Sequence, residues 1–527
     1  MIIQGITYFH PNKELLFDNI SFSISLGEKN ALIGNNGVGK STLLNILAGL
    51  LEPTSGKIIA DSKPYYIPQL FGQFNDYTIS QALQIENKLS AYKEILNGNA
   101  SEEYLLTLDD DWTIETRCQD ALKYWNLEDL DLDLRLSLLS GGQKTKIFLA
   151  GIMIHQPEVV LLDEPSNHLD TTSRQLLYNY IVSTTSSLLI VSHDRHLLNL
   201  LSTTYELTKH QVNVFGGNYD FYAEQKELAN MALSEDVRAK EKELRKSKEI
   251  ERLTNERQQR RNSNAKKTIA NAGLPTILQN TRKNAAENSS ARLKGVHSDK
   301  ISAISQELSS LRSELPDVDK MKFNFDNSHL HIGKMLVNAK DIEFSYGDKS
   351  IWNKPLTFNI ASGDRIAIKG DNGSGKTTLL QIILGKLHIN NGDIAIADFN
   401  AIYIDQEYSL IDEKLSIYEQ TQRFNATNLQ EHEIKIRLFR FLFDKESWDK
   451  PCSSLSGGEK MRLMLCLLNI HNQAPDVIIL DEPTNNLDIQ NIVILTAALN
   501  DYSGTLLVIS HDEVFLNEIG VVDAIEL

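Results

Sequence analysis

Two glycine-rich segments carry the residues best suited to chemistry, GNNGVGKST at 34–42 and GDNGSGKTT at 370–378. Both fit the spacing GxxxxGK[ST], and the first lies between an apolar run at 31–33 and a Leu-rich helix predicted over 41–51. Glycines at this spacing let backbone N–H groups turn inward around phosphate oxygens, and the start of a helix adds positive potential. The sequence therefore predicts two nucleotide-phosphate sites.

The lysine and the hydroxyl residue at the end of each loop have different predicted roles. Lys40 and Lys376 are expected to reach the β- and γ-phosphates, whereas Ser41 and Thr377 are expected to bind Mg²⁺. The nucleotide-binding residues predicted for the two loops are Gly34, Asn35, Asn36, Gly37, Val38, Gly39, Lys40, Ser41 and Thr42, then Gly370, Asp371, Asn372, Gly373, Ser374, Gly375, Lys376, Thr377 and Thr378.

Adjacent carboxylates follow a predicted buried strand in each half. The apolar run at 159–162 is typical of a parallel strand and ends at Asp163 and Glu164. Asp163 is placed to hold Mg²⁺, and Glu164 is placed to polarise the attacking water as a general base. Asp481 and Glu482 repeat the arrangement, so both sites are expected to hydrolyse the nucleotide.

A glutamine and a histidine recur at matching places in the two halves. Gln69 and Gln406 each follow a short predicted strand, where the side chain could touch the metal or the attacking water. His193 and His511 each follow another predicted buried strand and could hydrogen-bond the γ-phosphate. A structural histidine or a loop glutamine is the alternative for a single copy, and the repetition favours function.

A Ser-Gly-Gly sequence opens a predicted helix in each half, LSGGQ at 139–143 and LSGGE at 455–459. Such a helix start is another place where an anion can bind. The second copy differs in ending with glutamate. The residues concerned are Ser140, Gly141, Gly142 and Gln143, then Ser456, Gly457, Gly458 and Glu459.

With these motifs in this order, the two halves resemble ATP-binding-cassette (ABC) nucleotide-binding domains. The resemblance implies ATP and Mg²⁺ as cofactors, ATP hydrolysis, and head-to-tail pairing in which each Ser-Gly-Gly signature completes the opposite site. It places an adenine-stacking residue at Tyr346 and, less well suited, at His10. The implied catalytic residues are Glu164, Glu482, His193, His511, Gln69 and Gln406, and the implied metal-binding residues are Ser41, Gln69, Asp163, Thr377, Gln406 and Asp481.

The predicted fold class is α/β, with two tandem ABC-type domains joined by a long α-helical, coiled-coil-like hairpin. The domains expected are 1–215, with a short arm insertion at about 87–112, the linker 216–319, and 320–527. Within the linker, helices are predicted over 219–267 and 281–315. The second helix has a coiled-coil seam made of Ile301, Ile304, Leu308, Leu311 and Leu315.

Charge separates the linker from the rest of the chain. Residues 231–300 hold 17 Lys and Arg against 9 Asp and Glu, a net of +8 in a chain of net charge −17. A basic rod on an acidic body suggests a polyanionic partner, and a solvated helical surface is the alternative. The tip predicted at about 271–280 is uncharged and apolar, which favours an interaction site, and its central residues are Leu274, Pro275, Thr276, Ile277 and Leu278.

Two fused cassettes with a charged helical linker and no apolar run of membrane length resemble the ABC-F family of ribosome-associated ATPases. The long linker and short arm resemble its antibiotic-resistance (ribosomal protection) subgroup. The resemblance implies a cytoplasmic monomer that pairs its two cassettes internally, binds 50S rRNA and tRNA, and needs neither membrane nor DNA. A housekeeping ABC-F translation factor and the tandem ATPase of a sugar importer are the alternatives.

Three dispersed cysteines and an N-terminal segment without signal-peptide character are expected of a chain in a reducing compartment. Cys118, Cys452 and Cys466 have no CxxC spacing and are predicted to be small buried apolar residues.

Overall fold

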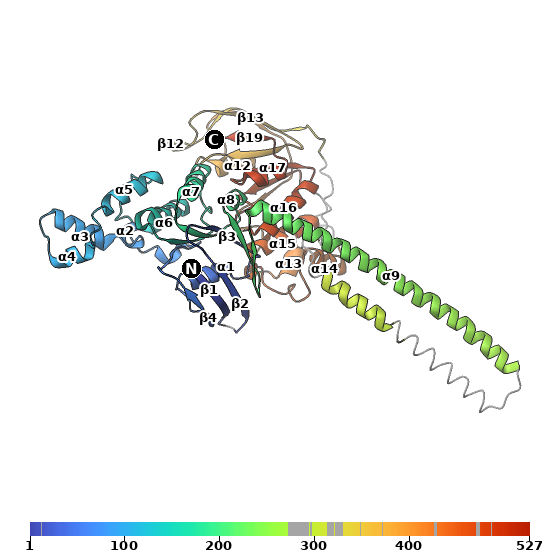
Figure 1. Cartoon of the computed structure of the whole chain (residues 1–527). Coiled ribbons are helices and arrows are strands. Elements are labelled where there is room, and N and C mark those ends of the chain that lie inside the picture. The colour runs from blue at the N-terminus through green and yellow to red at the C-terminus, as the bar shows by residue number, and fades with distance from the viewer. Residues whose placement is uncertain are drawn as a thin grey trace. The chain divides into compact units, whose positions relative to one another are not determined.

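The computed structural model describes residues 1–11, 13–271, 295, 298–312, 321, 330–347, 349–371, 373–425, 429–470, 475–485 and 487–527 (Figure 1). These residues form two compact units. One comprises Met1–Tyr222 and Met321–Leu527 and contains both halves with nucleotide motifs, and the other is Ala223–Lys320. The α/β class predicted for both halves is confirmed, and each half has its own apolar core.

Two sheets make up the first half. An antiparallel sheet has the order β2-β1-β4, with β1 (Ile2–Phe9), β2 (Leu15–Ser23) and β4 (Ser55–Ile59). The larger sheet has the order β5-β6-β7-β3-β8-β9 and is parallel except at β8–β9. Its strands are β3 (Lys29–Ile33), β5 (Tyr65–Ile67), β6 (Val159–Asp163), β7 (Ser187–Val191), β8 (Thr203–Leu207) and β9 (Val212–Phe215).

The parallel order brings three loops to one edge of this sheet. Strands β6 and β7 are buried along their whole length, as their apolar runs predict, and β3 pairs with β7. Because parallel strands end at the same edge, the glycine-rich loop after β3, the carboxylates after β6 and the histidine after β7 meet there.

Helices of the first half follow the strands that carry motifs, with a helical segment inserted between β5 and β6. The helices after motif-bearing loops are α1 (Lys40–Leu47), α6 (Gly141–His155), α7 (Thr171–Ser183) and α8 (Arg195–Asn199). The insertion contains α2 (Ile79–Ala82), α3 (Glu86–Leu96), α4 (Glu102–Leu108) and α5 (Ile114–Tyr124), and α3 lies beside α4 in the segment predicted as the arm (Figure 1).

The second half repeats this plan. Its antiparallel sheet has the order β13-β10-β15 and its parallel sheet the order β16-β17-β18-β14-β19. The strands are β10 (Met335–Glu343), β11 (Ser345–Tyr346), β12 (Lys349–Ser350), β13 (Leu356–Ala361), β14 (Arg365–Lys369), β15 (Asn391–Ile396), β16 (Ala401–Ile404), β17 (Val477–Asp481), β18 (Thr505–Ile509) and β19 (Asp523–Glu526).

The helices of the second half occupy matching places. They are α12 (Lys376–Ile383), α13 (Ile417–Arg423), α14 (Glu431–Arg440), α15 (Gly457–Ile470), α16 (Ile489–Asp501) and α17 (Glu513–Glu518). Short 3-10 helices occur at Gly72–Phe74, Leu136–Leu138 and Cys452–Ser454.

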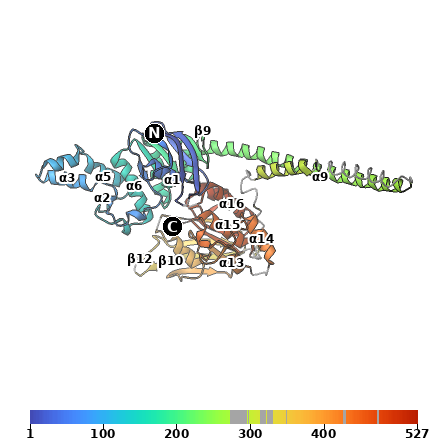
Figure 2. The ribbon, with the colours of Figure 1, turned by 90° about the horizontal axis from the view of Figure 1, so that it is seen from below.

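The helical unit is a pair of helices lying side by side. Helix α9 (Tyr219–Asn271) is 53 residues long, four residues longer at its end than predicted, and a helix over residues 298–312 lies along it (Figures 1 and 2). Lys240 Nζ lies 2.9 Å from Glu307 Oε2. Ile304 and Leu308 are buried, as the predicted seam requires.

Part of the predicted hairpin lies outside the described residues. This holds for Leu315 of the seam and for the tip residues Leu274, Pro275, Thr276, Ile277 and Leu278. Asn372 of the second glycine-rich loop also lies outside them.

All three cysteines are free and buried, and burial raises the pKa of the Cys118 and Cys452 thiols to about 11. None of the described helices combines the length and apolar character needed to cross a membrane.

Candidate functional site

Each glycine-rich loop wraps the start of a helix whose first N–H groups point into the loop. Gly39 and Gly375 precede α1 and α12 with φ of 102° and 93°, and neither helix has a side-chain N-cap. Uncapped N–H groups at a helix start can bind phosphate oxygens. Lys40 Nζ donates to Gly34 O at 2.7 Å, and Lys376 Nζ donates to Gly370 O at 2.7 Å. Each lysine thus lies inside its own loop, where it can exchange a carbonyl for a phosphate oxygen.

The structure brings together most residues predicted for the first site. A cavity of about 280 Å³ at the edge of the parallel sheet collects residues from the glycine-rich loop, from the segment after β5, and from the ends of β6 and β7 and the residues after them. Its lining includes His10, Asn36, Gly37, Gly39, Lys40, Ser41, Thr42, Gln69, Asp163, Glu164 and His193.

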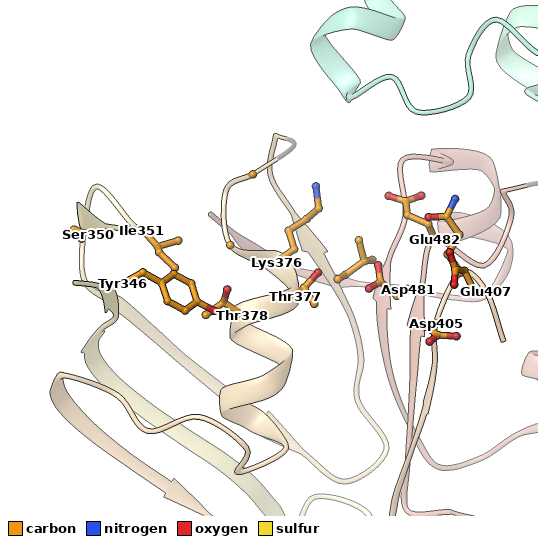
Figure 3. A pocket seen from close by; sticks show the side chains of 14 residues that line it. Tyr346, Ser350, Ile351, Lys376, Thr377, Thr378, Asp405, Glu407, Asp481 and Glu482 are labelled. Carbon is orange, nitrogen blue, oxygen red and sulfur yellow. The ribbon is translucent and has the colours of Figure 1, made fainter. Parts of the chain in front are cut away.

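The corresponding cavity of the second half measures about 770 Å³, a size that accommodates a nucleotide (Figure 3). Tyr346 lies on one side of Lys376 and Thr377, and Asp481 and Glu482 lie on the other. The predicted site residues in its lining are Tyr346, Gly373, Gly375, Lys376, Thr377, Thr378, Gln406, Asp481 and Glu482. Tyr346 is 59% exposed, so its ring face is accessible to a base.

The predicted general base and the histidine contact each other in both halves. Glu164 Oε1 lies 3.2 Å from His193 Nε2, and Glu482 Oε1 lies 3.3 Å from His511 Nε2. Burial and the neighbouring Asp163 raise the pKa of Glu164 to about 8. Burial raises the pKa of Glu482 to about 7, although the positive charge of Arg174 opposes the shift. Burial favours a neutral pair in each site.

Both glutamates have a backbone conformation that is rare for a residue with a side chain. Their φ angles are 53° for Glu164 and 47° for Glu482, in the left-handed region. Glu164 N donates to Val191 O, and Glu482 N donates to Ile509 O, both at 2.8 Å. These bonds hold each glutamate against the strand that ends at its histidine, and strain of about 1–3 kcal/mol at such positions is common in active sites.

We expect both histidines to stay neutral in the nucleotide-free protein at every pH above about 5. Burial lowers the pKa of His193 to about 3 and that of His511 to about 4, from an ordinary value of 6.5. The unfolded chain takes up these protons near pH 6.5 and the folded chain does not, so acidification from pH 6.5 to 4 favours unfolding. Histidine Cε1 chemical shifts recorded across this range test the expectation, and titration of either ring near pH 6.5 would contradict it.

Two tyrosines that sequence reasoning missed hydrogen-bond the aspartates predicted to bind Mg²⁺. Tyr403 Oη donates to Asp481 Oδ2 at 2.7 Å, and the Tyr66 hydroxyl hydrogen-bonds Asp163. The tyrosines repeat at the same separation as Gln69 and Gln406, which is the signal that could have found them.

The first site has oxygen donors that fit Mg²⁺. Ser41 hydrogen-bonds Asp163, and Gln69 lines the same cavity. Asp163 Oδ1 is buried and has no hydrogen-bond partner among the described residues, which suits an oxygen that binds a cation. Hydroxyl, carboxylate and amide oxygens are the protein ligands that Mg²⁺ prefers.

The last residue of each signature closes a helix cap. Ser140 Oγ accepts from Gln143 N at 3.3 Å and Gln143 Oε1 accepts from Ser140 N at 3.0 Å. Ser456 and Glu459 make the same reciprocal pair. Glutamate and glutamine both serve in such a capping box, which explains how the second half tolerates the change. The signature residues are not among the described residues that line either cavity.

Contacts between the halves involve the segments that follow Glu164 and Glu482. Asn36 N of the first glycine-rich loop donates to Asp488 Oδ2 of the second half at 2.8 Å. Thr171 Oγ1 of the first half lies 3.0 Å from His511 Nδ1 of the second. Sequence reasoning singled out Asn36 and His511 but not their partners Asp488 and Thr171.

Comparison with known proteins identifies the class that this geometry defines. The sequence profile of the family described as "ABC transporter" matches residues 17–167 and 353–485, which together exceed half of the chain. The chain therefore belongs to the ABC family and is an ATPase with two tandem cassettes. Its relatives refine this placement: it is an ABC-F family ATP-binding protein.

Similarity to two relatives extends over nearly the whole chain. The "Putative ATP-binding protein YdiF" of Bacillus subtilis (strain 168) is 30% identical over 96% of this chain and 77% of that protein. The "ABC transporter F family member 5" of Arabidopsis thaliana is 29% identical over 95% and 71%. A solved structure described as "Model of ribosome-bound archaeal Pelota and ABCE1" is similar with a TM-score of 0.56 at 17% identity, covering 98% of this chain and 74% of that chain, and shows the shared fold.

Proposed function

We propose that this chain is a ribosome-binding translation factor whose two ATP sites control the basic helical linker. One observation carries the proposal: two cavities lined by predicted ATP-site residues belong to halves that are joined in the chain by a segment with a net charge of +8 over residues 231–300. Basic helices suit the phosphates of RNA. The similar structure of archaeal Pelota and ABCE1 is described as ribosome-bound, which adds support from a protein of the same fold.

The proposed chemistry at the first site uses the described contacts. Lys40 exchanges the carbonyl of Gly34 for the β- and γ-phosphates, and Glu164, in its carboxylate form, takes a proton from the attacking water. His193 hydrogen-bonds the γ-phosphate. When bound by Ser41, Gln69 and Asp163, Mg²⁺ supplies charge compensation for the phosphates.

The second site uses the equivalent residues Lys376, Glu482 and His511, with Thr377, Gln406 and Asp481 as the proposed Mg²⁺ ligands. Each signature, Ser140-Gly141-Gly142 or Ser456-Gly457-Gly458, would complete the opposite site when the halves close on two ATP molecules. Closure binds the partner and hydrolysis releases it. The domains 1–215, 216–319 and 320–527, the cytoplasmic location and the monomeric state belong to this proposal.

The finer proposal concerns what the linker does on the ribosome. The uncharged sequence Leu274–Leu278 would reach a site on the 50S subunit near tRNA and displace an antibiotic, directly or through the tRNA. Inhibitory concentrations of 50S-targeting drugs, measured in a sensitive strain with and without the protein, distinguish protection from a housekeeping role in translation.

The test of ribosome binding uses a variant that binds ATP without cleaving it. With Glu164→Gln and Glu482→Gln combined, we expect the protein to sediment with ribosomes in ATP, because hydrolysis can no longer reopen the cassettes. A Lys40→Ala and Lys376→Ala variant should stay in the supernatant. Unchanged sedimentation of the glutamine variant, or its co-purification with a membrane permease, contradicts the proposal.

A further inference from the structure

We propose that Thr171, on helix α7 of the first cassette, is a positioning residue for the ATP site of the second cassette. Its hydroxyl Oγ1 lies 3.0 Å from His511 Nδ1, although the two residues are 340 positions apart. The proposal makes the two ATP sites chemically unequal. It rests on the proposed role of His511 at the γ-phosphate.

The counterpart of Thr171 in the second cassette cannot make this contact. Asp170 caps α7 by accepting from Ser173 N, and Asp488 caps α16 by accepting from Asn491 N. The first residue after each cap is therefore equivalent, and it is Thr171 in α7 but Ile489 in α16. An isoleucine side chain has no polar atom to offer a histidine.

The first site shows the consequence of this difference. His193 Nδ1 is buried and has no hydrogen-bond partner among the described residues. His193 and His511 share the contact at Nε2, which lies 3.2–3.3 Å from the catalytic glutamate of its own half. Only His511 has a hydroxyl from the opposite cassette at Nδ1.

The Thr171 hydroxyl can determine which nitrogen of the neutral His511 ring carries the proton. When the Thr171 hydroxyl donates to Nδ1 of His511, the ring proton resides on Nε2. Nε2 of His511 lies 3.3 Å from Glu482 Oε1 and has no hydrogen-bond partner among the described residues, so its proton is available to the γ-phosphate in the proposed mechanism. Both the tautomer and the ring orientation are thus fixed across the boundary between the cassettes.

The start of α7 is held firmly enough to serve this purpose. Arg174, one turn after Thr171, is buried, and its Nε donates to Leu169 O at 3.1 Å. Tyr178 Oη, one turn further on, donates at 2.5 Å to Asp194 Oδ2, in the residue after His193. The same helix therefore contacts His511 at its start and the His193 loop farther along.

The kinetic test measures hydrolysis at one site at a time. In an E164Q background the rate of a single turnover of ATP measures hydrolysis at the second site. In an E482Q background the same rate measures hydrolysis at the first site. Thr171→Val removes the hydroxyl at nearly constant shape. We expect it to slow ATP hydrolysis about fivefold more in the E164Q background than in the E482Q background, which is the effect of about one hydrogen bond. Thr171→Ser should restore the rate, and Ile489→Val is the matched control in the other cassette. Equal losses in the two backgrounds, or no loss, overturn the proposal.

A second measurement detects the contact without ATP turnover. In the nucleotide-free protein labelled with ¹⁵N-histidine, Thr171→Val should shift the His511 Nδ1 signal and leave His193 unchanged, with His511→Gln identifying the signal. An unmoved signal overturns the contact itself. If the signal shifts but His511→Gln does not slow the second site, the proposed role of His511 fails while the contact stands.

Discussion

Replacing Glu164 and Glu482 together by glutamine is expected to lower ATP turnover at least about a thousandfold while ATP binding is retained. A positioned general base contributes about 10²–10⁴-fold, and an amide cannot take the proton of the attacking water. Glu164 is buried and Glu482 is partly buried, and each lies 3.2–3.3 Å from the histidine of its own half. Glutamine keeps the size of glutamate and leaves the phosphate-binding loops unchanged.

Phosphate release under saturating ATP measures the turnover, and equilibrium titration with a fluorescent ATP analogue measures binding. The Lys40→Ala and Lys376→Ala variant is the control, because it should lose both properties. Residual turnover above about one tenth of the original rate would show that another group activates the water and that the two glutamates only shape the site.

The sequence predicts the chemistry of each site because it is encoded locally. A glycine-rich loop, a buried strand ending in two carboxylates and a strand ending in histidine each show their position by pattern, and parallel pairing then brings Lys40, Asp163 and His193 to one cavity. The second helix of the linker was predictable for the same reason, because the spacing of apolar residues such as Ile304 and Leu308, which are buried, is a local pattern.

Contacts between distant segments have no comparable local signal. Tyr66 and Tyr403 hydrogen-bond the aspartates from a neighbouring strand, and only their repetition marks them. Thr171 of the first half lies 3.0 Å from His511 of the second, a relation that α7 does not reveal by periodicity. The difference between Thr171 and Ile489 has a meaning only once each helix start is placed against the opposite site.

Substituting alanine for Gly39 and Gly375 together is expected to weaken ATP binding at least about a hundredfold, or about 2.7 kcal/mol per site. Both residues have left-handed φ angles that cost a residue with a Cβ about 1–2 kcal/mol. A Cβ at Gly39 would lie 2.7 Å from Leu16 Cδ2, and one at Gly375 would lie 2.4 Å from Ile351 Cγ2. Phe17, 2.9 Å from the first Cβ, is fully buried and cannot yield, so the loop itself must shift.

Two other glycines separate the effect of the clash from the effect of backbone strain. Gly49 and Gly385 follow α1 and α12 with φ of 72° and 69°, and a Cβ at either meets nothing within 4 Å. Alanine at both should therefore lower the free energy of unfolding by about 1 kcal/mol per position, measured by urea denaturation, and change ATP affinity less than about twofold. Calorimetric titration with ATP compares the two double variants. Equal ATP affinity of the two double variants would show that the close approach of Leu16 and Ile351 does not shape the glycine-rich loops. Phosphate binding would then depend on the lysines and the helix N-termini alone.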